Sequence, residues 1–150
     1  MQETYSRFSS VDSVDAPCAF IVLCTEPGAH SIRLCFSNIV GAASRDLVIR
    51  FDSVIACMSH TKYAHPWETY PITEIPQLGG DWGNAAYPLL EVKDSLWLDA
   101  FSATQLVGLD RGTVRHFRFV SLDNIVDVLV YGQCVLTTEW VDTSSSVVRT

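Results

Sequence analysis

Two stretches of alternating apolar residues, each broken by a tight turn, constrain the fold of this 150-residue chain most strongly. The first is residues 18–36, CAFIVLCTEPGAHSIRLCF, in which Pro27 and Gly28 take the second and third turn positions that favour them. Pairing Glu26 with Ala29 predicts a β-hairpin with one apolar face. That face contains Ile21, Leu23, Ile32, Leu34 and Phe36, and we expect it to lie in the core.

The second stretch is residues 114–130, VRHFRFVSLDNIVDVLV. Asp123 and Asn124 separate two apolar runs, which is typical of a hairpin closed by a two-residue type I′ turn. Pairing Leu122 with Ile125 then sets the predicted register. One face contains Phe117, Phe119, Val126, Val128 and Val130, and we expect this face to be buried as well.

Further apolar alternation predicts a bent strand near residues 46–59 and a last strand near 134–141. The predicted fold class is mainly β, bordering on α+β, with antiparallel sheets arranged as a sandwich or a half-closed barrel. A parallel nucleotide-binding fold would need strands that alternate with helices, and this pattern is absent.

One helix is predicted near residues 95–106, where the apolar period lengthens to that of a helix. Asp94 or Ser95 would cap its first turn. Trp97 and Phe101 lie on its apolar side, and we expect both to be core residues.

Length and composition indicate a single folded domain. Hydrophobic residues make up 48% of the chain and charged residues 18%, a balance far from that of disordered proteins. We expect a loose N-terminal tail over residues 1–16, one globular domain over 17–142 and a frayed C-terminus over 143–150.

Negative charge is concentrated in residues 64–110. The formal net charge of the chain is −7. This segment has one base, Lys93, against seven acids: Glu68, Glu74, Asp81, Glu91, Asp94, Asp99 and Asp110. Such a surface repels phosphate backbones and anionic lipids, so no nucleic-acid or membrane partner is expected. If this surface binds anything, a basic protein partner or a cation is favoured, but the charge alone favours an ordinary solvated acidic surface over a binding role.

The chain has five cysteines in no C-x-x-C pair and no regular spacing, which points to reduced thiols. No stretch reaches the roughly 20 apolar residues that cross a bilayer, and the first residues are too acidic for a signal peptide. We therefore expect a cytoplasmic protein.

The long connection over residues 59–88 contains four prolines and no apolar period, and a loop of this length is often functional. Its aromatic rings could line a cleft for a peptide or a sugar, or could simply pack on the sheet. The candidate binding residues are Tyr63, His65, Trp67, Glu68, Tyr70, Glu74, Asp81 and Trp82.

A zinc-type site can be drawn in the same loop from His60, His65 and Glu68, spaced H-x4-H-x2-E. Ligands at this spacing share a face only on a helix, and the neighbouring prolines leave room for one turn at most. Glu68 is better placed to stabilise the first turn after Pro66. No metal ion and no cofactor are therefore predicted.

Catalytic motifs are absent from the sequence: there is no G-x-S-x-G elbow, no phosphate-binding glycine loop and no H-E-x-x-H. Three arginines near His116 could clamp an anion. The alternative is that Arg118 pairs with Asp127, diagonal to it across the second hairpin, while His116 lies opposite Tyr131 as a structural residue. An enzyme is the less favoured interpretation.

The last third of the chain resembles a set of small bacterial proteins of unknown function. The resemblance depends on YPLLEVKDSLWLDAF, with Glu91, Val92, Ser95, Trp97 and Leu98, and on RHFRFVSLDNIVDVLV, with His116, Phe117, Asp127, Val128 and Leu129. Proteins of this kind are loosely similar to acidic immunity or adaptor proteins that neutralise a basic partner. None of the matched positions is a catalytic signature.

These observations lead to one main hypothesis and two alternatives. The main one is a non-catalytic interaction protein that binds a protein partner through the acidic, aromatic-rich segment 64–110. The first alternative is a small enzyme or a ligand- or metal-binding protein that uses His60, His65 and Glu68. The second is self-association through an edge strand of either hairpin.

Overall fold

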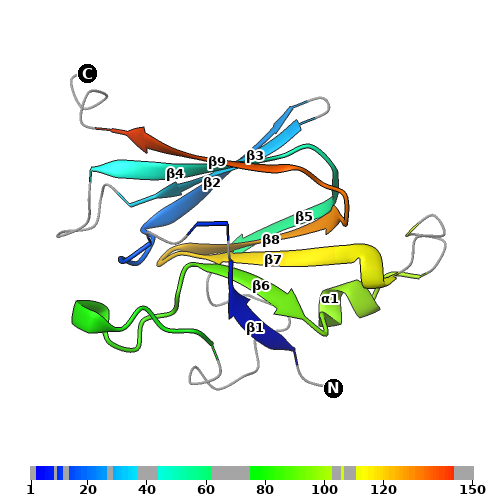
Figure 1. The fold of residues 1–150 in the computed structure, drawn as a ribbon, viewed down its shortest axis with the longest axis horizontal. Helices are drawn as coiled ribbons and strands as arrows, with labels where there is room; N and C mark the ends of the chain where they lie inside the picture. The colour runs from blue at the N-terminus through cyan, green and yellow to red at the C-terminus, as the bar shows by residue number, and fades with distance from the viewer. Residues whose placement is uncertain are drawn as a thin grey trace.

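The computed structural model describes residues 3–8, 10–11, 14–26, 29–36, 44–61, 75–102, 106 and 111–143. They form two antiparallel sheets stacked face to face (Figure 1). The five-stranded sheet has the order β1 (Thr4–Arg7), β6 (Leu89–Lys93), β7 (Val114–Val120), β8 (Asn124–Tyr131) and β5 (Val54–Thr61). The four-stranded sheet has the order β2 (Phe20–Glu26), β3 (Ala29–Cys35), β4 (Arg45–Phe51) and β9 (Leu136–Asp142). The predicted mainly-β fold with antiparallel sheets is confirmed, and the sheets do not close into a barrel.

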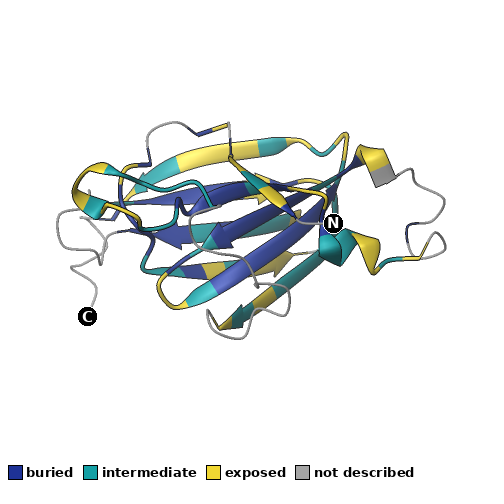
Figure 2. Ribbon diagram, turned by 90° about the horizontal axis from the view of Figure 1, so that it is seen from below, coloured by how far each residue is buried: buried dark blue, intermediate teal, exposed yellow. Residues whose placement is uncertain are grey.

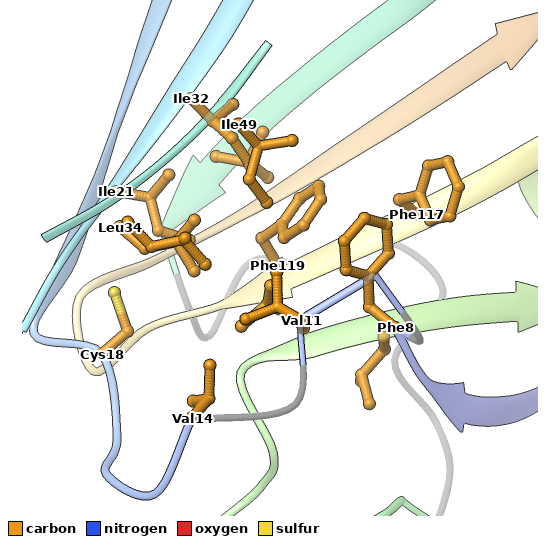
Figure 3. Packing of buried hydrophobic residues seen from close by; sticks show 14 of the residues in the cluster. Phe8, Val11, Val14, Cys18, Ile21, Ile32, Leu34, Ile49, Phe117 and Phe119 are labelled. Atoms are coloured by element: carbon orange, nitrogen blue, oxygen red, sulfur yellow. The ribbon is translucent and has the colours of Figure 1, made fainter. Parts of the chain in front are cut away.

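The hydrophobic core lies between the two sheets, where the inner faces of β3, β4, β7 and β8 meet (Figure 3). Phe51 on β4 lies 6.3 Å, centroid to centroid, from both Phe117 and Phe119 on β7. All three rings are buried. The buried residues are concentrated on the central strands, and the exposed ones lie mainly on edge strands and connections (Figure 2).

The first hairpin forms as predicted. Glu26 pairs with Ala29, and Ile32 and Leu34 are completely buried in the core. Residues 27–28 of the turn lie outside the described residues. Alternation along β2 and β3 therefore specified both the pairing and the buried face.

The predicted bent strand is two strands in different sheets. β4 ends at Phe51 and β5 begins at Val54, so the chain passes from one sheet to the other at Asp52 and Ser53 (Figure 1). The connection from β8 to β9 crosses beside it, and the backbone N–H of Val135 donates to Oδ1 of Asp52 at 2.7 Å. A bulge in the first residues of β5 lets the strand bend at this corner.

The second hairpin forms, but its predicted register is wrong by two residues. Val120 pairs with Ile125, so Arg118 lies directly opposite Asp127, and His116 lies opposite Leu129 rather than Tyr131. A shift of two residues keeps every side chain on its predicted face, because side chains alternate with a period of two.

Ser121 explains the register of this hairpin. Its Oγ accepts hydrogen bonds from the backbone N–H groups of Asp123 and Asn124, and it donates to Asn124. The side chain of Asn124 in turn donates to the carbonyl oxygen of Ile21 and accepts from its N–H, each at 3.0 Å. The longer turn thus ties the five-stranded sheet to β2.

The loose N-terminal tail predicted for residues 1–16 is wrong for the described part of that segment. β1 pairs with β6 through Thr4–Arg7, and Phe8 is 2% exposed. Phe8 stacks edge-on against Phe117 at 5.1 Å. Val11 and Val14 are buried in the same core. The tail prediction failed because a four-residue edge strand is too short to show a period. At the other end, residues 144–150 lie outside the described residues.

The predicted helix is shorter than residues 95–106. α1 comprises Leu96–Asp99, with Ser95 as its N-cap and Ala100 as its C-cap. Trp97 and Phe101 are half-buried, and neither belongs to the core cluster, so their assignment as core residues is wrong. They contact each other on the outer face of the five-stranded sheet, at 6.0 Å between ring centroids.

Candidate functional site

Most of the predicted binding residues lie in residues 62–74, outside the described part of the chain. These are Tyr63, His65, Trp67, Glu68, Tyr70 and Glu74. The structure describes the other two, Asp81 and Trp82, in the short 3-10 helix η3 (Gly80–Trp82). Asp81 is exposed, whereas Trp82 is half-buried and packs against the core cluster.

A glycine-rich turn presents Asp81 and Trp82. Gln77 and Ala86 form an antiparallel bridge, and the turn between them closes with a hydrogen bond from Gly79 N–H to Gly83 O. Gly79, Gly80 and Gly83 have φ angles of 74°, 56° and 57°, a region that other residues rarely adopt. The Gly79-Gly80 pair is therefore part of a tight turn.

This turn and the chain before β2 line one shallow pocket of about 340 Å³. Asp15 and Asp81 are exposed on it, and the indole of Trp82 forms part of its wall. The pocket thus brings together two carboxylates and an aromatic ring from segments 66 positions apart. Asp15 was not predicted, because it falls in the supposed tail.

The proposed zinc ligands are not brought together in the described structure. His60 lies on β5, opposite Ile125, and is half-buried, while His65 and Glu68 lie outside the described residues. Among the residues that the structure describes, no group of three or more His, Cys, Asp or Glu side chains could hold a metal ion.

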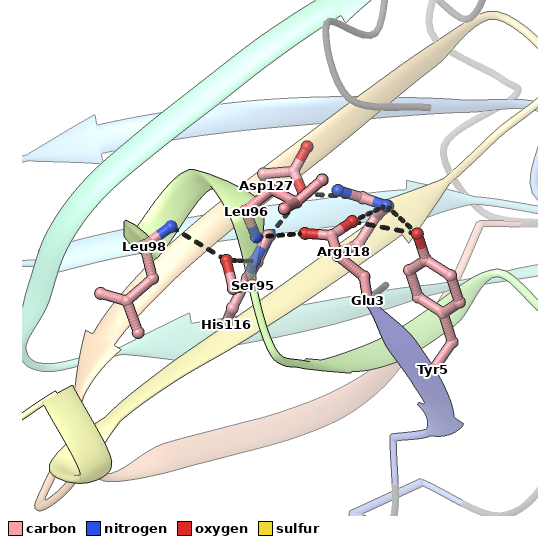
Figure 4. Close-up of polar contacts among 8 residues, drawn as sticks. All are labelled: Glu3, Tyr5, Ser95, Leu96, Leu98, His116, Arg118 and Asp127. Carbon is pink, nitrogen blue, oxygen red and sulfur yellow. Dashed lines mark hydrogen bonds and ion pairs between the residues drawn. The ribbon is translucent and has the colours of Figure 1, made fainter. Parts of the chain in front are cut away.

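A buried polar network on the outer face of the five-stranded sheet was not predicted as a unit (Figure 4). It joins six side chains from four segments of the chain: Glu3, Tyr5, Ser95, His116, Arg118 and Asp127. His116 is at its centre, with Nδ1 2.7 Å from Ser95 Oγ and Nε2 2.6 Å from Asp127 Oδ1. Both His116 and Asp127 are at most 1% exposed.

Arg118 connects the two halves of this buried network. Its Nε donates to Oδ1 of Asp127 at 2.8 Å and its Nη1 to the hydroxyl of Tyr5 at 3.2 Å. Burial alone would lower the pKa of Arg118, but the charges of Asp127 and Glu3 raise it. Burial raises the pKa of Tyr5. Arg118 is therefore a fixed cation in the sheet, held by Asp127 and Tyr5, while its Nη2 is buried without a hydrogen-bond partner among the described residues.

Glu3 attaches the N-terminal strand to α1. Its Oε2 accepts from the backbone N–H of Leu96 at 2.8 Å and its Oε1 from the hydroxyl of Tyr5 at 3.0 Å. Ser95 Oγ accepts from Leu98 N–H at 3.0 Å. The capping role predicted for Ser95 is thus confirmed, but no local pattern could have shown that Glu3 contributes from 93 positions away.

Arg115, the arginine next to His116 in the sequence, is also paired. Arg115 forms a bidentate ion pair with Glu91, at 3.1 Å for both contacts. Burial would raise the pKa of Glu91, but Arg115 and Lys93 together lower it. This arrangement supports pairing across the sheet rather than an anion clamp.

No protein-family model, curated protein or solved structure matches the chain. Within the described residues, no helix is long and apolar enough to cross a membrane. Function is therefore argued from the pockets and contacts of this structure.

Proposed function

We propose that the chain is an interaction protein that binds a basic protein partner through its acidic, aromatic-rich segment 64–110. The observation that carries the proposal is the pocket in which Asp15, Asp81 and Trp82 meet. Carboxylates attract a lysine or arginine side chain, and an indole face binds a cation further. Such a pocket has room for one basic side chain of a partner.

Charge distribution supports the same interaction. The segment carries one base against seven acids. That base, Lys93, forms an ion pair with Glu91 at 3.3 Å. Asp81 and Asp94 are exposed, and within the described part of the chain neither forms an ion pair with a basic side chain. A surface of this sign raises the association rate of a basic partner and repels nucleic acid and anionic membranes.

We also propose that the protein works in the cytoplasm, as its cysteines predict. All five thiols are free, and Cys18 and Cys35 are buried. Burial raises the pKa of Cys18 and, together with nearby Asp46, raises that of Cys35 to about 11. Unpaired cysteines suit a reducing compartment, and the raised pKa values make these two buried thiols unreactive. The resemblance to small bacterial proteins remains a prediction.

A lysine-rich peptide tests the interaction, with a glutamate-rich peptide of equal length as the reference. We expect the Asp81→Lys variant to bind the basic peptide about two- to tenfold more weakly, with an unchanged melting temperature, since single exposed ion pairs and cation–π contacts are modest. Binding should weaken with added salt. Reversal of Glu68 and Glu74 together with Asp81 should weaken it further.

Asp123→Lys is the matched control. Asp123 is exposed in the β7–β8 turn, and its reversal changes the net charge by the same amount. Equal weakening by both variants would show that the peptide senses only overall charge, and the pocket would not be the binding site. Loss of folding in Asp81→Lys would instead make Asp81 a structural residue.

A further inference from the structure

Ser95, His116 and Asp127 form a continuous hydrogen-bonded row (Figure 4). Ser95 Oγ lies 2.7 Å from His116 Nδ1, and His116 Nε2 lies 2.6 Å from Asp127 Oδ1. A hydroxyl, an imidazole and a carboxylate in this order are the three groups of nucleophilic acyl transfer. The imidazole is reversed relative to the common form of the triad, in which the serine contacts Nε2.

The hydrogen bonds assign a role to each nitrogen of a neutral His116. Asp127 accepts a hydrogen bond and so holds the imidazole proton on Nε2. Nδ1 is then left to accept the hydroxyl proton of Ser95. Arg118 donates to the same Oδ1 of Asp127 and fixes the carboxylate, which makes Arg118 and Asp127 positioning residues. Trp97 packs edge-on against the imidazole at 5.6 Å and limits its rotation.

Ser95 lies at a sharp turn between a strand and a helix. β6 ends at Lys93, Asp94 follows with a φ of 54°, and Leu96 begins α1. Asp94 is the only non-glycine residue with a positive φ among the described residues. In α/β-hydrolases a sharp turn from a strand to a helix also presents the nucleophilic serine, although here the positive φ belongs to Asp94, the residue before Ser95. Backbone strain is often retained at sites where a side chain must be aimed.

A pocket of about 550 Å³ opens on Ser95 and His116. Its size lies within the range of small-molecule sites. Val92, Leu98 and Val114 contribute apolar side chains. The charged part of the lining contains both signs, with Lys93 and Arg115 beside Glu91, Asp94 and Asp99. Ser95 is 5% exposed, so a reactant would reach its hydroxyl through this pocket.

We propose that Ser95, His116 and Asp127 are a nucleophilic centre that hydrolyses esters of small carboxylic acids bound in this pocket. Ser95 Oγ attacks the ester carbonyl carbon while its proton moves to His116 Nδ1. The tetrahedral intermediate collapses, the C–O bond to the alcohol breaks, and the alcohol leaves with that proton. Water then attacks the acyl-serine, gives its proton to His116, and releases the acid as His116 returns the proton to Ser95.

A fluorophosphonate tests the nucleophile in the intact protein, because it forms a stable phosphonyl ester with an activated serine and releases fluoride. We expect one adduct per chain by intact mass, located on Ser95 by peptide mapping. Prior unfolding in urea should abolish the adduct. A folded protein that gains no adduct on Ser95 would overturn the proposal and leave the row as a structural network.

Ester hydrolysis gives a second, independent measurement with p-nitrophenyl acetate as the probe. Ser95→Asn keeps a side-chain oxygen to cap α1 but removes the nucleophile, and it should lower the rate by at least about 10²-fold. Ser31→Ala is the matched control, since Ser31 is a half-buried serine on β3, in the other sheet. Equal rates in the wild type and in Ser95→Asn would refute the assignment.

Discussion

Phe8 provides the sharpest test of how the N-terminal segment is held. Its ring is 2% exposed and lies edge-on to Phe117 at 5.1 Å and to Phe119 at 6.1 Å. Its N–H donates to the carbonyl of Leu89 at 3.0 Å, which continues the pairing of β1 with β6. Replacing Phe8 by alanine removes the ring and leaves the backbone bond in place.

The expected loss in the free energy of unfolding is about 3–5 kcal/mol, the cost of a buried Phe→Ala change that leaves a cavity. Two edge-on aromatic contacts, at about 0.5–1.5 kcal/mol each, are included in that loss. Urea unfolding followed by tryptophan fluorescence measures it, and the slope of the transition should stay the same.

Leu122→Ala is the control for this measurement. Leu122 is 54% exposed, and its truncation should change the stability by no more than about 0.5 kcal/mol. A loss below about 1 kcal/mol for Phe8→Ala would refute the docking of the N-terminal segment and restore the loose tail that the sequence predicts.

Two further predictions concern the link between the sheets and the buried thiols. Asn124→Ala leaves the N–H and carbonyl of Ile21 without their partner and should cost about 1–3 kcal/mol by urea unfolding, whereas a loss near zero would mean that water replaces the side chain. Burial raises the pKa values of Cys18 and Cys35, so their stabilisation is complete below the pKa of an unfolded cysteine and is lost as the pH rises through the folded values. The urea midpoint should therefore fall between about pH 9 and 11, and less steeply in Cys35→Ala; an unchanged midpoint over that range would contradict the burial of these thiols.

The sequence predicted the buried faces of the strands more reliably than the residue pairs across neighbouring strands. Ile32, Leu34, Phe117 and Phe119 are buried as their alternation indicated. Arg118 pairs with Asp127 as predicted, but the register of the hairpin was wrong by two residues, because a serine hydroxyl rather than the turn dipeptide closes the β7–β8 connection. Periodicity reports which side of a strand is apolar, but a shift of two residues leaves that signal unchanged.

In the candidate sites, too, the sequence showed local features but not contacts between distant residues. Asp81, Trp82 and Ser95 could be selected from local patterns, because glycine turns and helix caps depend on residues that are adjacent in the sequence. Asp15 beside Asp81, and Glu3 beside Leu96, could not be selected, since their partners are 66 and 93 positions away.

By itself, the sequence determined that this chain forms antiparallel strands, which faces of its hairpins are apolar and where its negative charge is concentrated. These properties depend on neighbouring residues and on composition. Only the tertiary structure decided which strands share a sheet, that residues 4–8 complete one of them, and that Ser95, His116 and Asp127 form one row. Such contacts arise only when the whole chain packs, because the free energy of that packing depends on residues that are distant in the sequence.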